Sequence, residues 1–341
     1  MLVGLGLKTE EFSQAFKRLG FNAFVQVFNF GLVSAVVFGF TRFLLSVNWV
    51  NEDLAAGMVV CSCLPMAINV VIVLTASAGG DEAAAVFNTT FGNILGIFLS
   101  PALILGYLGS SSEIALVDIF YKLSLRVVLP LAVGQLLQKF SPPVVAFAAK
   151  HKRRFKKAQE YCLVFIVYTV FCKTFESGER SAGLGDVFLM IFFQFLLMIS
   201  LMAVAWYSLG FTFPNQPKSR VMGVFGCTMK TVALGIPLIN SIYENDPNMG
   251  LYALPLLIWH PMQLVIGTIM TPRLVAYIET EEKRLKDEKE EDEKEAAKRV
   301  NYNYSQTALT AKNDEEGPTS NDVETPVDRK EETSTKKEEA I

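Results

Sequence analysis

Long apolar stretches alternate with short polar segments over most of the chain. A helix needs about 20 mostly apolar residues to cross roughly 30 Å of hydrocarbon. Eight stretches approach or exceed this length, and the fifth is the shortest, so it could be a tilted or partly buried helix. The predicted spans are 21–45, 54–75, 83–108, 115–137, 161–175, 187–209, 221–242 and 251–278.

These stretches lack the strict alternation of apolar and polar residues that a half-buried strand shows. In lipid, a backbone satisfies its own polar groups only in helices or closed barrels, so the missing alternation favours helices. A soluble helical bundle with basic loops is the alternative, but it would need polar faces on helices that are mostly apolar all round. The sequence therefore predicts an all-α polytopic membrane protein.

The orientation of the spans follows from the Lys and Arg residues in the short loops. One side of the predicted spans holds twelve of them, including seven between residues 139 and 157, whereas the other side holds only Lys173 and Arg180. Because basic loops collect on the cytoplasmic side, both termini are predicted to be cytoplasmic. We expect a multi-pass protein of the plasma membrane or a secretory-pathway membrane.

Charge divides the chain into segments. About half of residues 278–341 are Lys, Arg, Asp or Glu, against about one in eight of residues 1–277. We expect the end of a helix and a cytoplasmic loop at 1–20, a transmembrane domain at 21–278 and a charged tail at 279–341. The tail predicts a solvated helix as far as Arg299, supported by charge pairs, and disorder beyond it. A basic patch with interleaved aromatics is missing, so nucleic acid is not an expected partner.

Two of the predicted spans carry a proline near the middle, Pro65 and Pro237. Each is followed by a second proline, Pro101 or Pro272, about 35 residues further on. The two spans enter the membrane from opposite faces, so this pattern predicts an inverted repeat. A mid-span proline can break a helix and free backbone groups, which persist in a membrane only where they line a cavity or bind something. We therefore predict helix breaks at Pro65 and Pro237 that mark a transport site, with simple kinks as the alternative.

Several motifs resemble a known family across residues 1 to about 276. They are Leu7-Lys-Thr-Glu-Glu-Phe12, Gly79-Gly-Asp-Glu-Ala-Ala-Ala-Val-Phe-Asn88, Leu108-Gly-Ser-Ser-Ser112, Tyr168-Thr-Val-Phe-Cys172, Leu234-Gly-Ile-Pro-Leu238 and Pro255-Leu-Leu-Ile-Trp-His-Pro261. With them the chain resembles the bile acid:sodium symporter family, in its sodium/bile acid cotransporter 7 branch. The resemblance implies an inverted-repeat transporter fold of ten helices, with a panel subdomain and a core subdomain. Two discontinuous helices of the core would cross at the ion and substrate site.

The beginning of the chain resembles the end of a helix, because seven apolar or Gly residues run directly into Lys8. Against the family pattern, the chain begins near the end of the second helix. We therefore expect an N-terminally truncated member in which eight of the family's ten spans are present.

The resemblance also implies candidate ion ligands. Gln26 matches a sodium ligand in the family's third helix, Asn69 one in the first broken helix, and Thr89 one in the helix after it. Asn69 and Thr89 are thus the candidate residues for a bound sodium ion.

Three other positions depart from the pattern of the sodium-coupled relatives. Gly226 stands where those relatives carry a carboxylate shared by two sodium sites, Ala85 replaces a hydroxyl ligand, and Lys230 replaces a glutamine. Hard cations prefer oxygen ligands with a compensating negative charge. We therefore expect no two-sodium coupling. Activity should be independent of sodium, linked to protons, or dependent on one sodium at most, and no other cofactor is expected.

Lys230 and its neighbour Thr231 are further candidates for contact with an ion or substrate. Lys230 lies about nine residues into its span, in the second predicted broken helix. Its ammonium could hold the crossing together, exchange a proton, or act as a counterion for an anionic substrate, whereas snorkelling to the interface is the alternative. We predict that Asn69 and Lys230 approach each other where the two broken helices cross.

The residue inventory also bears on function. The two histidines lie in distant segments and the spans hold no cluster of carboxylates, so a membrane enzyme is not expected. The favoured function is that of a secondary transporter that moves an organic anion or other small solute. The resemblance also leaves open a non-transporting regulator of cellular calcium. Expected partners are a small-molecule or ion substrate and the lipid bilayer, and the oligomeric state stays open.

Overall fold

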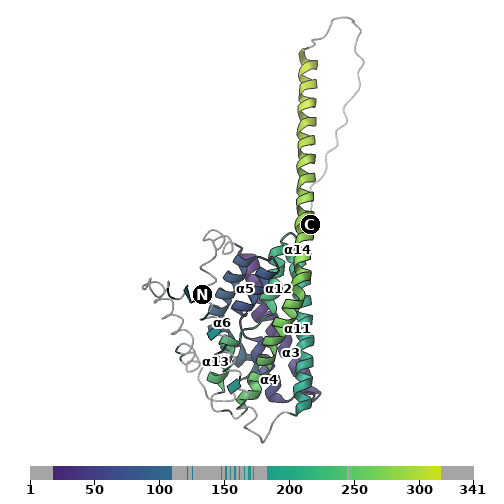
Figure 1. Ribbon diagram of the computed structural model, residues 1–341. Helices are drawn as coiled ribbons and strands as arrows, with labels where there is room; N and C mark the ends of the chain where they lie inside the picture. Colours follow the sequence, from purple (N-terminus) through teal and green to yellow (C-terminus); the bar gives the residue numbers. More distant parts are fainter. Residues whose placement is uncertain are drawn as a thin grey trace, which may run out of the picture. The chain divides into compact units, whose positions relative to one another are not determined.

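A computed structural model describes residues 18–109, 183–243, 246 and 248–315, with isolated residues between 121 and 172. Within these ranges the only extended pairing is an isolated bridge, so the all-α prediction is confirmed. The elements are α2 Leu19–Val27, η1 Phe28–Leu32, α3 Val33–Ser46, α4 Glu52–Ser62, α5 Ile68–Ser77, α6 Glu82–Leu108, α11 Leu184–Thr212, α12 Pro217–Thr228, α13 Val232–Ile242 and α14 Met249–Glu315 (Figure 1).

In the part of the chain that the structure describes, four stretches of helix are long and apolar enough to cross a membrane, and they coincide with the first, third, sixth and eighth predicted spans. The second predicted span is divided into α4 and α5, and the seventh into α12 and α13. The fourth and fifth predicted spans, 115–137 and 161–175, lie outside the continuous ranges that the structure describes. The four spanning stretches are Leu19–Ser46, Glu82–Leu108, Gly185–Thr212 and part of Met249–Val300.

Large apolar side chains are exposed along these helices. Phe98 on α6, Phe211 on α11 and Ile269 on α14 are each more than half exposed. A water-soluble surface rarely carries so many such groups, whereas lipid tails accommodate them. The chain is therefore an integral membrane protein.

Local sequence sets the ends of several helices. Asn51 caps α4 by accepting a hydrogen bond from the Asp53 amide at 2.8 Å, and Asp81 caps α6 by accepting one from the Ala84 amide at 2.9 Å. Short polar side chains at this position satisfy amides that the first helical turn leaves unpaired. Pro217 is the first residue of α12, where its missing N–H costs nothing.

Helix α12 lies at the centre of the packing. It contacts α2, η1, α5, α6 and α11, and Figure 1 shows α5, α12 and α11 side by side. Its residues from Val221 to Thr228 are all buried. On α4, a Cβ atom added at Gly57 would lie 2.6 Å from the Tyr252 carbonyl oxygen, so α4 and α14 pack too closely there for any larger residue.

The chain forms two compact units, Met1–Arg284 and Leu285–Ile341. The predicted end of the transmembrane domain at residue 278 stays a prediction. The first unit holds all elements from α2 to α13 and the beginning of α14, and it contains the site described below.

In the second unit, α14 continues to Glu315. The predicted solvated helix is confirmed, with i,i+4 ion pairs such as Lys294 with Glu290 and Arg299 with Glu295. The prediction of disorder directly after Arg299 is wrong for residues 301–315, which remain helical. The sequence from residue 279 to Glu315 contains no Gly or Pro, the residues that disfavour a helix most, whereas Gly317 and Pro318 follow.

Candidate functional site

The site lies where the two helix breaks meet. Residues 63–67 separate α4 from α5, and residues 229–231 separate α12 from α13. Met66 and Lys230 form an antiparallel bridge between the two breaks. The predicted pair of broken helices is therefore present, and their breaks are in contact.

Two backbone hydrogen bonds accompany this bridge. The Ala67 amide donates to the Met229 carbonyl at 3.2 Å, and the Thr231 amide donates to the Pro65 carbonyl at 3.0 Å. Ala67, Met229 and Thr231 all have extended backbone conformations. The pairing satisfies amide and carbonyl groups that an interrupted helix would otherwise leave unpaired in the membrane.

Gln263 of α14 completes the pairing from the other side of Lys230. Its Oε1 accepts from the Lys230 amide at 2.8 Å, and its Nε2 donates to the Lys230 carbonyl at 3.0 Å. Gln263 is fully buried, and its Nε2 also lies 3.0 Å from Nδ1 of His260. The side-chain amide thus acts on Lys230 as a neighbouring strand would.

The Lys230 side chain is fully buried, with 0% exposed. Its Nζ donates to the Asn29 carbonyl at 3.0 Å, Asn29 Oδ1 at 2.8 Å, the Ser62 carbonyl at 2.7 Å and the Leu64 carbonyl at 3.0 Å. An ammonium has three hydrogens, so four acceptors use all of them and share at least one. Snorkelling is excluded in this conformation, and no hydrogen remains for a substrate anion.

All four acceptors of the ammonium are neutral. Ser62 is the last residue of α4, and Leu64 follows in the break, so both carbonyls lie at the negative end of that helix dipole. Within the described ranges, none of the ion pairs involves Lys230. The oxygens and the helix end therefore stabilise the buried charge without a carboxylate.

Asn29 reaches Lys230 from an irregular turn. It belongs to η1, a π-helical turn between α2 and α3 that widens the helix. Such turns free carbonyl groups from the regular ladder and are frequent at functional sites. Here the Asn29 carbonyl and side chain both bind the ammonium, and its Nδ2 lies 3.4 Å from the Leu64 carbonyl.

The predicted sodium ligands do not converge on Lys230. Asn69, in the first turn of α5, is exposed and is not among the residues that bind the ammonium. Thr89 is fully buried on α6, and its hydroxyl donates to the Ala85 carbonyl at 2.7 Å within the same helix. The two breaks are in contact, as the Met66–Lys230 bridge shows, whereas the predicted approach of the Asn69 and Lys230 side chains stays a prediction.

The two positions that lack sodium ligands are filled with apolar atoms. A Cβ atom added at Gly226 would lie 3.1 Å from Met222 Cε and 3.3 Å from Val25 Cγ1, and Ala85 is fully buried. Met222, Val25 and Ala85 all belong to the apolar core. The atoms nearest a side chain at Gly226 are thus carbon and sulfur, and they offer no oxygen in place of the missing carboxylate.

The second break is not at Pro237. Pro65 lies in the first break as predicted, but Pro237 lies inside α13, and the break precedes it at residues 229–231. A proline removes an amide and crowds the residue before it and the carbonyl four residues earlier, so its effect extends toward the N-terminus of the helix. Thr231, the predicted neighbour of the ion or substrate, is buried and forms the N-cap of α13.

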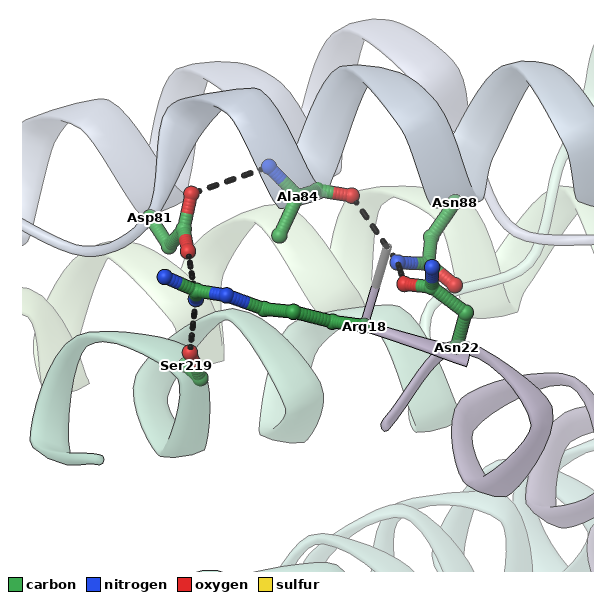
Figure 2. A network of polar contacts seen from close by, with 6 residues as sticks. All are labelled: Arg18, Asn22, Asp81, Ala84, Asn88 and Ser219. Carbon is green, nitrogen blue, oxygen red and sulfur yellow. Dashed lines mark hydrogen bonds and ion pairs between the residues drawn. The ribbon is translucent and has the colours of Figure 1, made fainter. Parts of the chain in front are cut away.

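A polar network joins α2, α6 and α12 near their ends (Figure 2). One nitrogen of Arg18 donates to Asp81 at 2.7 Å and to the buried Ser219 hydroxyl at 3.0 Å. Asn88 Nδ2 donates to Asn22 Oδ1 at 2.7 Å. These side chains connect helices that are far apart in the sequence.

Gln26 extends this network toward the centre of the unit. Its Nε2 donates to the Asn88 carbonyl at 3.0 Å, and its Oε1 is buried with no hydrogen-bond partner among the described residues. A Cβ atom added at Gly92 would lie 2.8 Å from this Oε1. Gln26 therefore links α2 to α6, and its role as an ion ligand stays a prediction.

Asn29 and Gln263 were missed from the sequence, although both contact Lys230. Each is a single amide residue within an apolar stretch, as Asn88, Asn93 and Gln194 are. These other amides form contacts between helices or within them. The sequence alone does not distinguish them from the two amides that contact Lys230. Their depth within a span was the one available signal, because polar groups there usually face the protein interior.

A family model, described as the SBF-like CPA transporter family, matches residues 1–276. The chain belongs to this family. It is similar to Sodium/bile acid cotransporter 7 of Rattus norvegicus, with 33% identity over 83% of this chain and 82% of the relative. The same-named proteins of Danio rerio and Gallus gallus are 32% and 31% identical over 83% of this chain, covering 83% and 80% of those relatives.

The SBF-like family assignment agrees with the fold described above. The protein is an integral membrane protein of a transporter family, and its apolar helices agree with that assignment. Within this SBF-like chain, the crossing of the two broken helices is held by a lysine ammonium and by neutral oxygens.

Proposed function

We propose that this protein is a secondary transporter that moves an organic anion or other small solute and in which the Lys230 ammonium takes the place of a bound sodium ion. The observation that carries the proposal is the set of four oxygens within 3.0 Å of Lys230 Nζ. Oxygen atoms around one positive charge are also what a sodium site requires.

Electrostatics supports the same proposal. A sodium ion about 4 Å from the ammonium would be repelled by about 4 kcal/mol at an effective dielectric constant near 20, which is about a thousandfold in affinity. Gly226 supplies no carboxylate to offset this repulsion, and its surroundings are apolar. Coupling to two sodium ions is therefore not expected, and transport should be sodium-independent or linked to protons.

Flux in proteoliposomes tests the proposal. The full chain and a Lys230→Gln variant would be reconstituted and offered a panel of radiolabelled organic anions under imposed sodium or proton gradients. We expect wild-type uptake that persists when sodium is replaced by N-methyl-D-glucamine. Uptake that rises with the square of the sodium concentration would overturn the coupling proposal. Absence of uptake by protein that is shown to be folded would contradict transport and favour a regulatory role.

A further inference from the structure

The orientation of the Gln263 side-chain amide is determined by its partners. The Lys230 amide can only donate and the Lys230 carbonyl can only accept, so Oε1 of Gln263 faces the amide at 2.8 Å and Nε2 faces the carbonyl at 3.0 Å. The same Nε2 lies 3.0 Å from Nδ1 of His260. An amide nitrogen carries two hydrogens, so Gln263 donates one to Lys230 and the other to His260.

This donor fixes the protonation of His260. Because Nδ1 accepts from Gln263, it carries no hydrogen, and the imidazole is neutral with its hydrogen on Nε2. The opposite orientation of the ring would bring a C–H group to the same donor and satisfy neither. The ring is half-buried, and its Nε2 has no hydrogen-bond partner among the described residues and is not among their buried unpaired atoms. His260 therefore reaches the surface of this unit.

We propose that His260 and Gln263 form a proton-sensitive switch on the break between α12 and α13. With neutral His260, Gln263 binds both backbone groups of Lys230. A proton taken up from solution at Nδ1 turns this acceptor into a donor that faces the N–H of Gln263. The amide meets the new donor by turning its oxygen toward His260, which places its Nε2 against the Lys230 amide and ends both hydrogen bonds to the break.

The two arrangements differ in what holds the second break. The bonds from Ala67 to Met229 and from Thr231 to Pro65 do not involve Gln263, so the two breaks stay paired with each other in both. Protonation removes the contact between the break and α14. The switch would thus let α14 move relative to the crossing while the crossing itself persists.

No charged side chain of the described residues pairs with the imidazole, so Gln263 is the contact through which a proton acts. Near His260, α14 packs against α3, α4, α5, α11 and α13. Helices α5 and α13 carry no ionisable residue. Those on the other elements and in the second break are Arg42, Glu52, Asp53, Cys61, Asp186, Tyr207 and Lys230. The Lys230 ammonium is directed at Asn29 and the end of α4.

As the place where a proton would be coupled to transport, the switch rests on the proposed function. Its hydrogen bonding does not, and it can be observed without any flux. A switch that responds to pH in a protein without uptake would reject the transporter proposal alone. Uptake by a protein whose second break ignores His260 would reject the switch alone.

Selective labelling makes both parts of the switch visible by nuclear magnetic resonance. Met229–Lys230 is the one Met-Lys pair in the sequence, so ¹³C-labelled methionine carbonyls and ¹⁵N-labelled lysine select the Lys230 amide. The chain has two histidines, and His151→Gln leaves His260 as the single imidazole in a ¹⁵N-histidine sample. The full chain in detergent micelles would be followed from about pH 9 to about pH 4, around the ordinary histidine pKa of about 6.5.

We expect His260 to carry its hydrogen on Nε2 at high pH, and the Lys230 amide signal to shift with the same midpoint as the protonation of His260. The shift should be lost in His260→Leu, which binds no proton, and kept in His151→Gln. A Lys230 amide that stays unchanged while His260 is protonated would overturn the switch. A ring that stays neutral over the whole range, or a shift that persists in His260→Leu, would do the same.

Discussion

Lys230 illustrates how neutral oxygens can hold a positive charge inside a membrane protein, since no carboxylate among the described residues binds it. Its ammonium is bound by two backbone carbonyls at the end of α4 and by the carbonyl and side-chain oxygen of Asn29. Unlike a sodium ion, it is tethered to the chain and cannot leave when the protein changes conformation. We therefore expect the ammonium to stabilise the crossing throughout the conformational changes of the protein.

Removing this ammonium should be costly. In Lys230→Met, four buried acceptor atoms lose their donor, and we expect about 2 to 4 kcal/mol of destabilisation, since buried unsatisfied groups cost about 1–3 kcal/mol each before relaxation. Thermal unfolding in detergent measures the effect. Lys218→Met is the control, because Lys218 is half exposed and forms an ion pair with Glu282 that should be worth little. Equal stability of the two variants would contradict the role of Lys230.

The sequence predicted that Lys230 lies deep inside its span, but it did not predict which residues bind it. A lysine well inside an apolar span is unusual enough to stand out, because charges there are rare. Asn29 and Gln263 resembled other amides, and their roles depend on which turn of another helix they meet. The exposure of Asn69 likewise depends on the rotation of α5, which its apolar sequence leaves open.

The breaks between α4 and α5 and between α12 and α13 position the site. Apolar length and proline content predicted both broken helices, but the second break lies before Pro237 rather than at it. The location of that break is fixed by pairing with residues 65–67, which is a contact between distant segments. Local sequence cannot specify such a contact.

Gln263 provides a test of this pairing. Gln263→Leu removes both hydrogen bonds to the Lys230 backbone and should destabilise the protein by about 2 kcal/mol, since a buried amide and carbonyl are left unpaired. Gln263→Glu keeps an oxygen to accept from the Lys230 amide but, when ionised, loses the donor. In thermal unfolding, both variants should be less stable than the wild type. A wild-type midpoint in Gln263→Leu would show that the bridge does not need this residue.

Asp81 combines a helix cap with an ion pair, and two variants separate these roles. Asp81→Ala removes both, whereas Asp81→Asn keeps an oxygen for the Ala84 amide and removes the charge that faces Arg18. We expect Asp81→Ala to cost about 1 kcal/mol more than Asp81→Asn, because capping is worth about that much and partly exposed ion pairs are worth less. Equal losses in chemical unfolding would assign the effect to the ion pair alone.

For the molecule as a whole, polar side chains follow one helix from its end to the crossing. Arg18, Asn22, Gln26 and Asn29 recur at helical spacing along α2 and η1, and their contacts run from α6 and α12 to Lys230. Such a series within an apolar bundle fixes the register of the helices, since a shift would leave several buried groups unpaired. The all-α membrane fold was predictable from apolar length alone, whereas this network was not.

Sodium-dependent stability tests the replacement of a sodium ion by Lys230 most directly. Thermal unfolding of the wild type and Lys230→Gln would be measured in sodium chloride and in N-methyl-D-glucamine chloride at equal ionic strength. A bound ion at one hundred times its dissociation constant stabilises a protein by about 2.7 kcal/mol, so binding would be visible. We predict the same wild-type midpoint in both salts and a higher midpoint in sodium for Lys230→Gln. A wild-type midpoint that rises in sodium, with no larger rise in Lys230→Gln, would contradict the replacement.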